Sequence, residues 1–518
     1  MNRLDRVISY LLPGAGARRA QQRMRVAALS SAYDAVESGR LRRKAKDWGS
    51  GNTAAQGAQR PLRDLARHLD RNHDLARGAL NVMVRNIVGP TGIGVEPQPL
   101  NSDGTINEDL AGQLAELHRQ WRKLPEVTGE YDWARSEQLL CRSWLRDGEV
   151  FWQYLEGEVP YLTHATPVPF SLELMESDVV PLDQFDLGRN VFQGIRRNAW
   201  GRPISYFVYK SHPGDIATGF VPAMKEVSTD RIGHLKLVDR IGQLRGVSMF
   251  ASVLTRLDDL KDYEESERIA AKVAASMAAY IKKGAPEDYS PPTDSAGNPL
   301  PRREMTFQAG MVFDDLNIGE DVGTIDSKRP NPNAIPWREG QLKAVAAGAD
   351  VGYSSISRNY DANYSAQRQE LVETWGAYAL LSNAFIDQCS REVYERQVAA
   401  AVLGGLVKVP RGITFAQLTN ALYIAPQMPW IDPKKEADAF GVLEDRCYIS
   451  GAEVVRRMGR NPRDTLRSEA QWQQQLRDAA VVNTTTVKTP PSGAATPTAD
   501  APANGADANA TADQELIA

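Results

Sequence analysis

The longest regular pattern of apolar positions begins near residue 367 and has the period of an α-helix. Apolar side chains recur there every three or four residues, which places them on one helical face over about seven turns. These positions are Leu371, Trp375, Tyr378, Leu381, Phe385, Cys389 and Val393. A polar segment leads directly into them and contains Arg358, Asn359, Tyr360, Asp361, Asn363 and Tyr364. The pattern predicts a long amphipathic helix entered from a polar loop.

A second long helix is predicted over residues 251–283. Its apolar stripe is discontinuous and its first half is acidic, while Lys282 and Lys283 stand before Gly284, where a helix C-cap belongs. Such a helix is marginal alone and needs neighbours along its length. It is either an ordinary buried helix of a bundle, or part of a repeated interface or of an aqueous channel, and its acidic outer face and low hydrophobicity favour the second. We predict that its apolar positions contact other subunits. The candidates are Leu257, Leu260, Val273 and Met277.

The first half of the chain combines helical and strand periods. Arginines lie mostly off the apolar stripe of its first helical region, and from Asp147 onward the period changes to two. The predicted elements are a helix or helix pair over 60–88, helices over 107–123 and 136–146, strands over 148–154 and 171–175, and a hairpin that joins 192–196 to 204–209. Residues 147–235 therefore form a β-rich part of an α+β fold.

Length and charge refine this picture. A chain of 518 residues is too long for one ordinary core, so several domains are expected. The first 85 residues hold 17 Lys or Arg against 7 Asp or Glu. A basic arm of this kind is either a solvated surface or a contact for nucleic acid or an acidic partner. The segment 483–518 is poor in apolar bulk and is predicted to be disordered.

Cysteine and hydropathy patterns exclude several classes of protein. The three cysteines, Cys141, Cys389 and Cys447, are far apart and support neither a disulfide framework nor a zinc site. They indicate a reducing compartment, and Cys389 lies on an apolar stripe, as a core thiol would. No run of eighteen apolar residues occurs, so no transmembrane helix is expected.

A search for catalytic motifs finds no phosphate-binding loop, no HExxH and no GxSxG sequence. Acidic pairs are the one chemical alternative. Asp147 with Glu149, and Glu176 with Asp178, could supply the carboxylate cluster of a metal-dependent nuclease, although D-G-E and E-S-D sequences are common in turns. We predict no catalytic residues and no metal ligands.

Six segments follow one another in a characteristic order between residues 60 and 465. They are RNIVGPTGIGV (85–95), RDGEVFWQYL (146–155), GIRRNAWGRPISYFVY (194–209), RIGHLKLVDRIGQLRGVSMF (231–250), NIGE (317–320) and NYSAQRQ (363–369). Each motif alone is weak, but their common order argues against coincidence. With these segments the chain resembles the lambda-type portal, or head–tail connector, proteins of tailed bacteriophages.

This resemblance implies a portal-protein fold of the α+β class in a ring-forming subunit. Its parts would be a basic flexible arm (1–59), a β-rich wing (60–250), a first stem helix (251–283), a Pro-rich clip (284–325), a region of second stem, tunnel loop and crown-side helices (326–470), and the disordered tail (483–518). Arg302 and Arg303 in the clip become candidates for contact with the terminase.

The resemblance also implies a function. Twelve copies would form a ring at one capsid vertex, through which double-stranded DNA is packaged and ejected without sequence specificity. The implied partners are the major capsid protein and scaffold, the terminase large subunit, and head-completion or tail connector proteins. The protein would belong to the virion, and to the host cytoplasm during assembly. No enzymatic activity, cofactor or membrane contact is implied.

The polar loop before the long helix has two interpretations. Asn, Tyr and Arg side chains can hydrogen-bond phosphates and stack without reading base sequence, which suits a surface that DNA slides past. Alternatively, Asn363 or Ser365 caps the helix that follows. The DNA-channel candidates are Arg358, Asn359, Asn363, Tyr364 and Arg368.

Two other functions remain open at this point. The first is a metal-dependent nucleic-acid enzyme that uses the carboxylates named above. The second is a DNA-binding capsid scaffold protein that is not a portal.

Overall fold

The computed structural model of the chain describes residues 49–215, 223–276, 280–283, 293–296, 298, 320–323, 331–361, 363–429 and 432–479. The chain divides into two compact units, residues 1–461 and residues 462–518. In the second unit the described residues form one helix, α15 (Pro462–Asp478). The predicted arm up to residue 48, the predicted tail over 483–518, and the clip candidates Arg302 and Arg303 lie outside the described residues.

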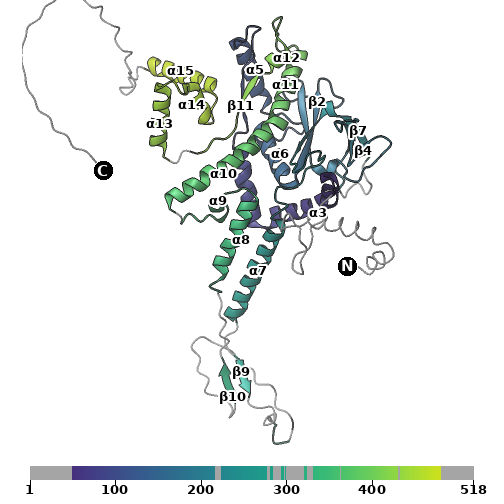
Figure 1. Cartoon of the computed structure of the whole chain (residues 1–518), viewed down its shortest axis with the longest axis vertical. Helices are drawn as coiled ribbons and strands as arrows, with labels where there is room; N and C mark the ends of the chain where they lie inside the picture. Colours follow the sequence, from purple (N-terminus) through teal and green to yellow (C-terminus); the bar gives the residue numbers. More distant parts are fainter. Residues whose placement is uncertain are drawn as a thin grey trace, which may run out of the picture. The chain divides into compact units, whose positions relative to one another are not determined.

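The first unit combines helices with antiparallel sheets, which confirms the predicted α+β class (Figure 1). The predicted helical region over 60–88 is a pair of helices, and two more follow as expected. They are α3 (Gly51–Asn72), α4 (Asp74–Ile87), α5 (Glu108–Trp121) and α6 (Trp133–Asp147). Ser50 accepts a hydrogen bond from the N–H of Thr53 and caps α3. The predicted flexible arm of 1–59 is therefore too long, because residues 51–59 are helical.

Two antiparallel sheets form the strand-rich region, with the strand orders β3-β2-β8 and β4-β5-β6-β7. The strands are β2 (Glu149–Glu156), β3 (Phe170–Met175), β4 (Val191–Phe192), β5 (Ile195–Arg197), β6 (Pro203–Tyr209), β7 (Met224–Ser228) and β8 (Ile232–Lys236). The predicted hairpin is confirmed: β5 pairs with β6, with Ile195 opposite Tyr206. Short 3₁₀ turns, η2 (Ser177–Val179) and η4 (Thr229–Arg231), lie beside these strands.

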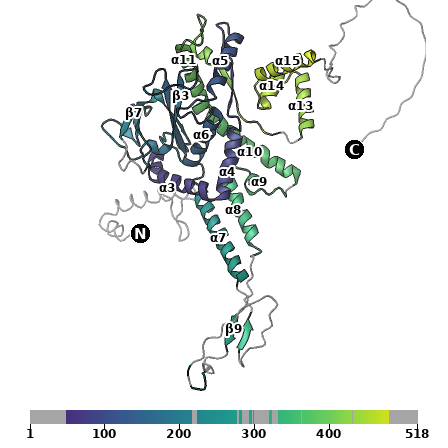
Figure 2. The same cartoon turned by 180° about the vertical axis from the view of Figure 1, so that it is seen from behind.

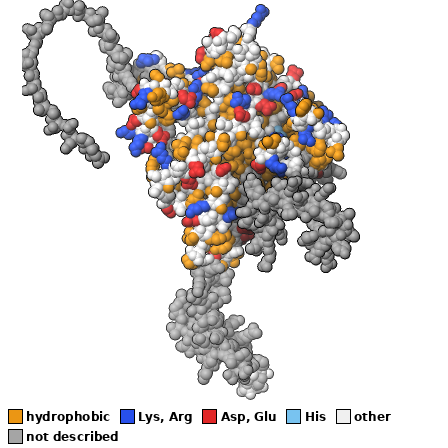
Figure 3. Space-filling model, viewed as in Figure 1, with side chains coloured by type: hydrophobic (Ala, Val, Ile, Leu, Met, Phe, Trp, Pro, Cys, Tyr) orange, Lys and Arg blue, Asp and Glu red, His pale blue; other side chains and the backbone are white. Residues whose placement is uncertain are grey.

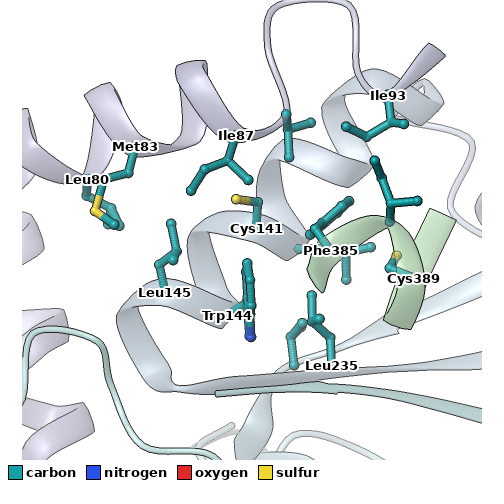
Figure 4. Close-up of a cluster of buried hydrophobic side chains, with 14 of the residues drawn as sticks. Leu80, Met83, Ile87, Ile93, Cys141, Trp144, Leu145, Leu235, Phe385 and Cys389 are labelled. Atoms are coloured by element: carbon teal, nitrogen blue, oxygen red, sulfur yellow. The ribbon is translucent and has the colours of Figure 1, made fainter. Parts of the chain in front are cut away.

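The main hydrophobic core lies where α4, α6, the three-stranded sheet and the long helix meet. Figure 4 shows Ile87 of α4 and Cys141 and Trp144 of α6 in one cluster with Phe385 and Cys389 of the long helix. Cys389 is fully buried, as predicted for a core thiol. A smaller cluster fills the space between β2 and the four-stranded sheet. The three-stranded sheet thus packs on the helices, and the four-stranded sheet packs on β2, β3 and β8 through the smaller cluster.

The long helix predicted from the apolar stripe is present and begins at Tyr364. It consists of α10 (Tyr364–Phe385), a π-helical turn (Ile386–Ser390) and α11 (Arg391–Leu403). The later stripe positions Phe385, Cys389 and Val393 are buried, whereas Leu371 is half-buried. The helix is therefore anchored in the core by its C-terminal half, and its N-terminal half is less covered.

A buried carboxyl group holds the π-helical turn in place. Glu137 on α6 accepts hydrogen bonds from Ser390 Oγ at 2.8 Å and from the N–H of Ile93 at 2.8 Å. Burial raises the pKa of Glu137 to about 7, although the charge of Arg122 and these hydrogen bonds act in the opposite direction. The Glu137 carboxyl group therefore changes its protonation near neutral pH.

We expect Glu137→Gln to change how stability depends on pH. Because the folded pKa is raised from 4.5 to about 7, folding takes up a proton in this window, and the contribution of Glu137 to stability decreases as the pH rises through it. The variant lacks this dependence of the free energy of unfolding on pH, whose slope is at most about 1.4 kcal/mol per pH unit. Urea denaturation should show the variant gaining stability relative to the wild type between about pH 5 and about pH 7. A difference that is constant with pH would contradict the assignment.

Helices α7 (Leu254–Ser276) and α8 (Ala334–Gly348) lie side by side (Figure 2). Arg256 donates to Gln341 Oε1 at 2.7 Å, and Arg338 forms an ion pair with Glu264. Since a later residue of α7 meets an earlier residue of α8, the two helices run antiparallel. Leu257 is 1% exposed in the core that this chain forms by itself.

The predicted helix over 251–283 is wrong in its last part. In the described residues α7 ends at Ser276, and Tyr280–Lys283 form strand β9, which pairs antiparallel with β10 (Glu320–Gly323). The local sequence period favoured a helix, but pairing with a segment distant in sequence decides the outcome. Of the predicted clip over 284–325, the structure describes residues 293–296, 298 and 320–323.

The remaining elements follow or flank the long helix. Strand β1 (Gly94–Pro97), after the Gly-rich turn, pairs antiparallel with β11 (Ala421–Ile424). The helices are α9 (Tyr353–Ser357), α12 (Phe415–Leu418), α13 (Pro433–Asp445) and α14 (Gly451–Arg457). Among the described residues, no helix combines the length and the apolar character needed to cross a bilayer.

Candidate functional site

The α9–α10 loop, residues 358–363, carries most of the residues predicted to meet DNA. Arg358 ends α9 in the left-handed conformation, with φ at 57°. Asn359 Oδ1 accepts a hydrogen bond from the N–H of Asp361 at 2.9 Å, and Asn363 Oδ1 accepts one from the N–H of Ala366 at 2.8 Å. Asn363 is thus the N-cap of α10, as one of the two interpretations predicts. The side chains of the loop hold its own backbone.

The helices that flank the loop, α9 and α10, contact each other, and α9 also contacts α8. Glu370 on α10 accepts a hydrogen bond from the N–H of Ser354 on α9 at 2.9 Å. Ile356 of α9 is buried, and Lys343 of α8 lies over the ring of Tyr353 at 5.3 Å from its centroid. The loop is therefore held at both ends by packed helices, which fix the positions of its polar groups.

The loop and the first turns of α10 present their polar side chains to solvent. The exposed DNA-channel candidates are Arg358, Asn363, Tyr364 and Arg368, and Asn359 is half-buried. Tyr360 and Tyr364 are 54% and 58% exposed. Guanidinium groups and phenol rings together can bind phosphates and stack on bases of any sequence. The geometry suits contact with nucleic acid, and that role stays a prediction.

The subunit-interface candidates are distributed differently. Leu257 and Leu260 are 1% and 0% exposed in the core of this chain, so their apolar surface is already covered without a partner. Val273 belongs to α7, but its side chain is not among those described, and Met277 lies outside the described residues. A surface for another subunit has to be sought farther along α7 and α8.

Sequence reasoning missed a buried ionic network between α3, β2, β8 and the turn before α7. Glu149 on β2 accepts hydrogen bonds from Arg245 Nε at 2.8 Å, Gln59 Nε2 at 2.7 Å, His234 Nε2 at 3.1 Å and the N–H of Gly246 at 2.9 Å. The side chains of Glu149 and Arg245 are both fully buried. Four distant parts of the chain therefore meet on one carboxylate.

The electrostatics of this network follow from burial and pairing. Burial alone would raise the pKa of Glu149, but the charge of Arg245 and hydrogen bonds from His234 and Arg245 outweigh it and hold the pKa well below its usual range. Burial lowers the pKa of His234 to about 4 despite the neighbouring carboxylate. At neutral pH the network thus contains one ion pair and a neutral imidazole.

Arg245 also connects the network to the strand-rich region. Its guanidinium donates to the backbone carbonyl oxygens of Gln193 at 2.9 Å and of Val180 at 3.1 Å. Arg245 therefore satisfies polar backbone groups that would otherwise be buried without a partner.

A second ionic cluster contains most of the carboxylates considered for a nuclease. Arg67 Nη2 lies 2.7 Å from Asp147, 3.3 Å from Glu176 and 2.7 Å from Asp178, and Arg63 pairs with Asp178 at 3.0 Å. The structure brings these three carboxylates together, whereas Glu149 belongs to the separate network. Guanidinium groups stand where a divalent cation would have to bind.

Among the described residues, one group of side chains lies close enough to share a metal ion: Glu176, Asp178 and His212. Arg67 already contacts both of these carboxylates. Two positive charges, from Arg63 and Arg67, lie against Asp178 and oppose a further cation. The arrangement favours a structural ion-pair cluster over a metal-dependent active site.

Two glycines allow two backbone segments to pass in close contact beside Glu149. Gly148 has φ at 92°, and a Cβ at Gly148 would lie 2.4 Å from the carbonyl carbon of Val247. A Cβ at Gly246 would lie 2.0 Å from the carbonyl oxygen of Gly148. Side chains are excluded on both sides of this contact. Gly148 and Glu149 belong to the D-G-E motif, and Arg245 and Gly246 to the R-G-V-S motif. The motifs mark these residues, but nothing in the sequence indicates that the two motifs meet.

Comparison with known protein families decides the identity. The family model described as "Phage portal protein, lambda family" matches residues 37–381. The chain belongs to the lambda family of phage portal proteins. Two of the six motif segments, 146–155 and 231–250, supply Glu149, His234 and Arg245 of the buried network, and a third, 363–369, contains the N-cap of α10.

Relatives of known name agree with this assignment. The chain is 24% identical over 420 residues to a "Probable portal protein" of Halomonas phage phiHAP-1, an alignment that covers 78% of each protein. It is 22% identical over 249 residues to "Portal protein B" of Escherichia phage lambda, covering 44% of this chain and 46% of that protein. With the "Portal protein" of Escherichia phage N15 it shares 24% identity over 220 residues, covering 38% and 41%.

Solved structures with a similar chain come from gene transfer agent particles. One is the virion of the native particle, with 13% identity, a TM-score of 0.41, and coverage of 80% of this chain and 99% of that chain. Another is the neck of the native particle computed with C12 symmetry, with 13% identity, a TM-score of 0.41, and coverage of 77% and 94%.

Proposed function

We propose that this portal protein forms a closed ring of twelve copies at one capsid vertex, and that double-stranded DNA passes through the ring during packaging and ejection. The observation that carries the proposal is the α9–α10 loop, whose Arg358, Tyr360 and Asn363 are exposed, in a chain of the portal family. The ring assembles in the host cytoplasm with the capsid and scaffold proteins and becomes part of the virion. It docks the terminase large subunit and later the head-completion or tail connector proteins.

The proposed role is structural and requires no catalysis by this chain. The ATPase that drives packaging belongs to the terminase partner. The carboxylates that favoured the alternative of a metal-dependent enzyme are paired with arginines. The match to the portal family over residues 37–381 favours a portal over the alternative of a non-portal scaffold protein.

The α7–α8 pair supports assembly into a ring. Beyond Leu260 the described part of α7 is only partly covered, and Ile269 is 52% exposed. On α8, Ile335 is 68% exposed, while the ring of Trp337 packs against that of Tyr263, tilted by 45° with 4.2 Å between ring centroids. Figure 3 shows hydrophobic side chains among charged ones on this part of the surface. A neighbouring copy that covers Ile269 and Ile335 would give the pair the contacts that two helices alone do not supply.

The charge of α7 is compatible with a surface that DNA passes. The first half of the helix is acidic, and Asp259, Asp262 and Glu265 are exposed. Acidic side chains repel phosphates and so do not hold DNA in place, whereas sparse arginines provide weak contacts that are screened by salt. We propose that the α9–α10 loop supplies such contacts.

We expect the double variant Arg358→Ala with Arg368→Ala to form normal rings and to reduce packaged DNA, or its retention, by about twofold or more. Both side chains are exposed, so their removal changes no core contact. The measurement is the amount of nuclease-protected DNA per particle after packaging. Normal packaging by this variant would contradict a channel-facing loop.

Two controls separate DNA contact from helix capping. Arg202→Ala with Arg231→Ala removes the same charge from exposed positions of the strand-rich region and should leave packaging unchanged. Asn363→Ala removes the N-cap of α10 and should lower stability by about 1 kcal/mol. If packaging followed thermal stability in all three variants, the loop would have only a structural role.

A further inference from the structure

A hollow between α4 and α6 has an excess of positive charge that the ionic clusters described above do not neutralise. It has a volume of about 250 Å³. The described lining residues include three arginines and no carboxylate, and they are Asn81, Val84, Arg85, Gly89, Pro90, Arg135, Gln138, Leu139 and Arg142. The hollow borders the Gly-rich turn that ends α4, since Gly89 and Pro90 line it.

One arginine of the hollow is fixed and already compensated. Arg142 Nε donates to Asp70 at 3.2 Å, and Arg142 Nη1 donates to Asn81 Oδ1 at 2.8 Å. Asp70 also pairs with Arg146 at 3.3 Å, so its charge is shared. Because Asn81 uses its oxygen for Arg142, its amide nitrogen is left as a donor at the hollow.

The other two arginines contribute uncompensated charge. Arg135 Nη1 lies 3.5 Å from Gln138 Oε1, while Gln138 Nε2 donates to the carbonyl oxygen of Gly89 at 3.0 Å. Gln138 thus positions Arg135 against the Gly-rich turn. Among the described residues, the side chain of Arg85 makes no hydrogen bond or ion pair. Both Arg85 and Arg135 are exposed and pair with no described carboxylate.

We propose that this hollow binds a phosphate group. Guanidinium groups offer paired N–H donors that match phosphate oxygens, and a charge-assisted bond of this kind is about twice as strong as a neutral one. The hollow of about 250 Å³ has room for one small oxyanion group. Because Arg85 and Arg135 are exposed, the attraction is that of a solvated site and weakens with salt.

Two sources of phosphate share this chemistry: the backbone of duplex DNA and free phosphate. The proposal is independent of ring formation, since rings can form whether or not the hollow binds an anion. Binding to the full-length protein is measured for inorganic phosphate by titration calorimetry and for a short mixed-sequence duplex by fluorescence anisotropy. Each probe is tested with the wild type and the variants below.

The test variant is Arg85→Ala with Arg135→Ala, and the charge-matched control is Arg202→Ala with Arg231→Ala in the strand-rich region. All four arginines are exposed, so the variants should fold, which circular dichroism checks. We expect the Kd for phosphate to rise about tenfold or more in the test variant only. Arg85→Lys with Arg135→Lys keeps the charge and should lose less affinity, because lysine lacks the paired donors.

The two probes distinguish backbone phosphate from free phosphate as the ligand. Weaker duplex binding by the test variant, with a salt dependence whose slope falls by about 2, identifies backbone phosphate as the ligand. Weaker binding of inorganic phosphate alone identifies free phosphate. If neither probe binds less tightly to the test variant, or if the control loses as much affinity, the phosphate site is overturned.

Discussion

Arg245→Ala is expected to lower the free energy of unfolding by about 3–5 kcal/mol, because it leaves Glu149 buried and charged without its ionic partner. The change also removes the donors for the carbonyl oxygens of Gln193 and Val180. Denaturation by urea, followed by circular dichroism, measures the loss. Glu149 of the D-G-E motif and Arg245 and Gly246 of the R-G-V-S motif belong to this network, so its removal should disturb the centre of the first unit.

Two further variants test the reason for this loss. Arg245→Lys retains a positive charge but has fewer donors, so it should lose less stability than Arg245→Ala. Arg202→Ala removes an exposed arginine and should change stability by no more than about 0.5 kcal/mol. A loss below about 1 kcal/mol for Arg245→Ala would show that the network is not a major source of stability.

Gly246→Ala should destabilise the fold by at least about 3 kcal/mol, which is the upper part of the usual range for overpacking. The added Cβ would lie 2.0 Å from the carbonyl oxygen of Gly148 and 2.7 Å from its carbon. These are backbone atoms, and Gly148 is itself restricted by Val247, so no flexible side chain can move away. The midpoint of urea denaturation provides the measurement.

The matched control for this substitution is Gly112→Ala in α5. A Cβ there has no atom within 4 Å, and alanine favours a helix over glycine by about 1 kcal/mol. The two substitutions are chemically identical but should shift stability in opposite directions. A tolerated Gly246→Ala would mean that the crossing of the two backbones is looser than the structure shows.

Features that depend on local periodicity were predictable from the sequence. The stripe that ends with Phe385, Cys389 and Val393 repeats at helical spacing, and these residues are buried along one continuous helix. The β5–β6 hairpin likewise combines alternating strands with a turn between them. Such a pattern depends only on which residues share one face of a single helix or strand. A short window of sequence therefore contains it.

Features that join distant segments were not predictable. Gln59, Glu149, His234 and Arg245 come from four separate parts of the chain, and no local pattern indicates that they meet. Strand β9 was mistaken for the end of a helix because its partner β10 lies far along the chain. Leu257 was predicted to face a neighbouring subunit because nothing local in the sequence reveals the core formed around it.

We propose that copies of this chain form a ring whose hole is lined by the α9–α10 loop. Electron cryomicroscopy of the assembled full-length protein tests this claim most directly. We expect closed rings with a central hole, with residues 358–368 at the inner surface and the exposed Ile269 and Ile335 covered by a neighbouring copy. Particles without a central hole, or rings with this loop on the outer surface, would contradict it.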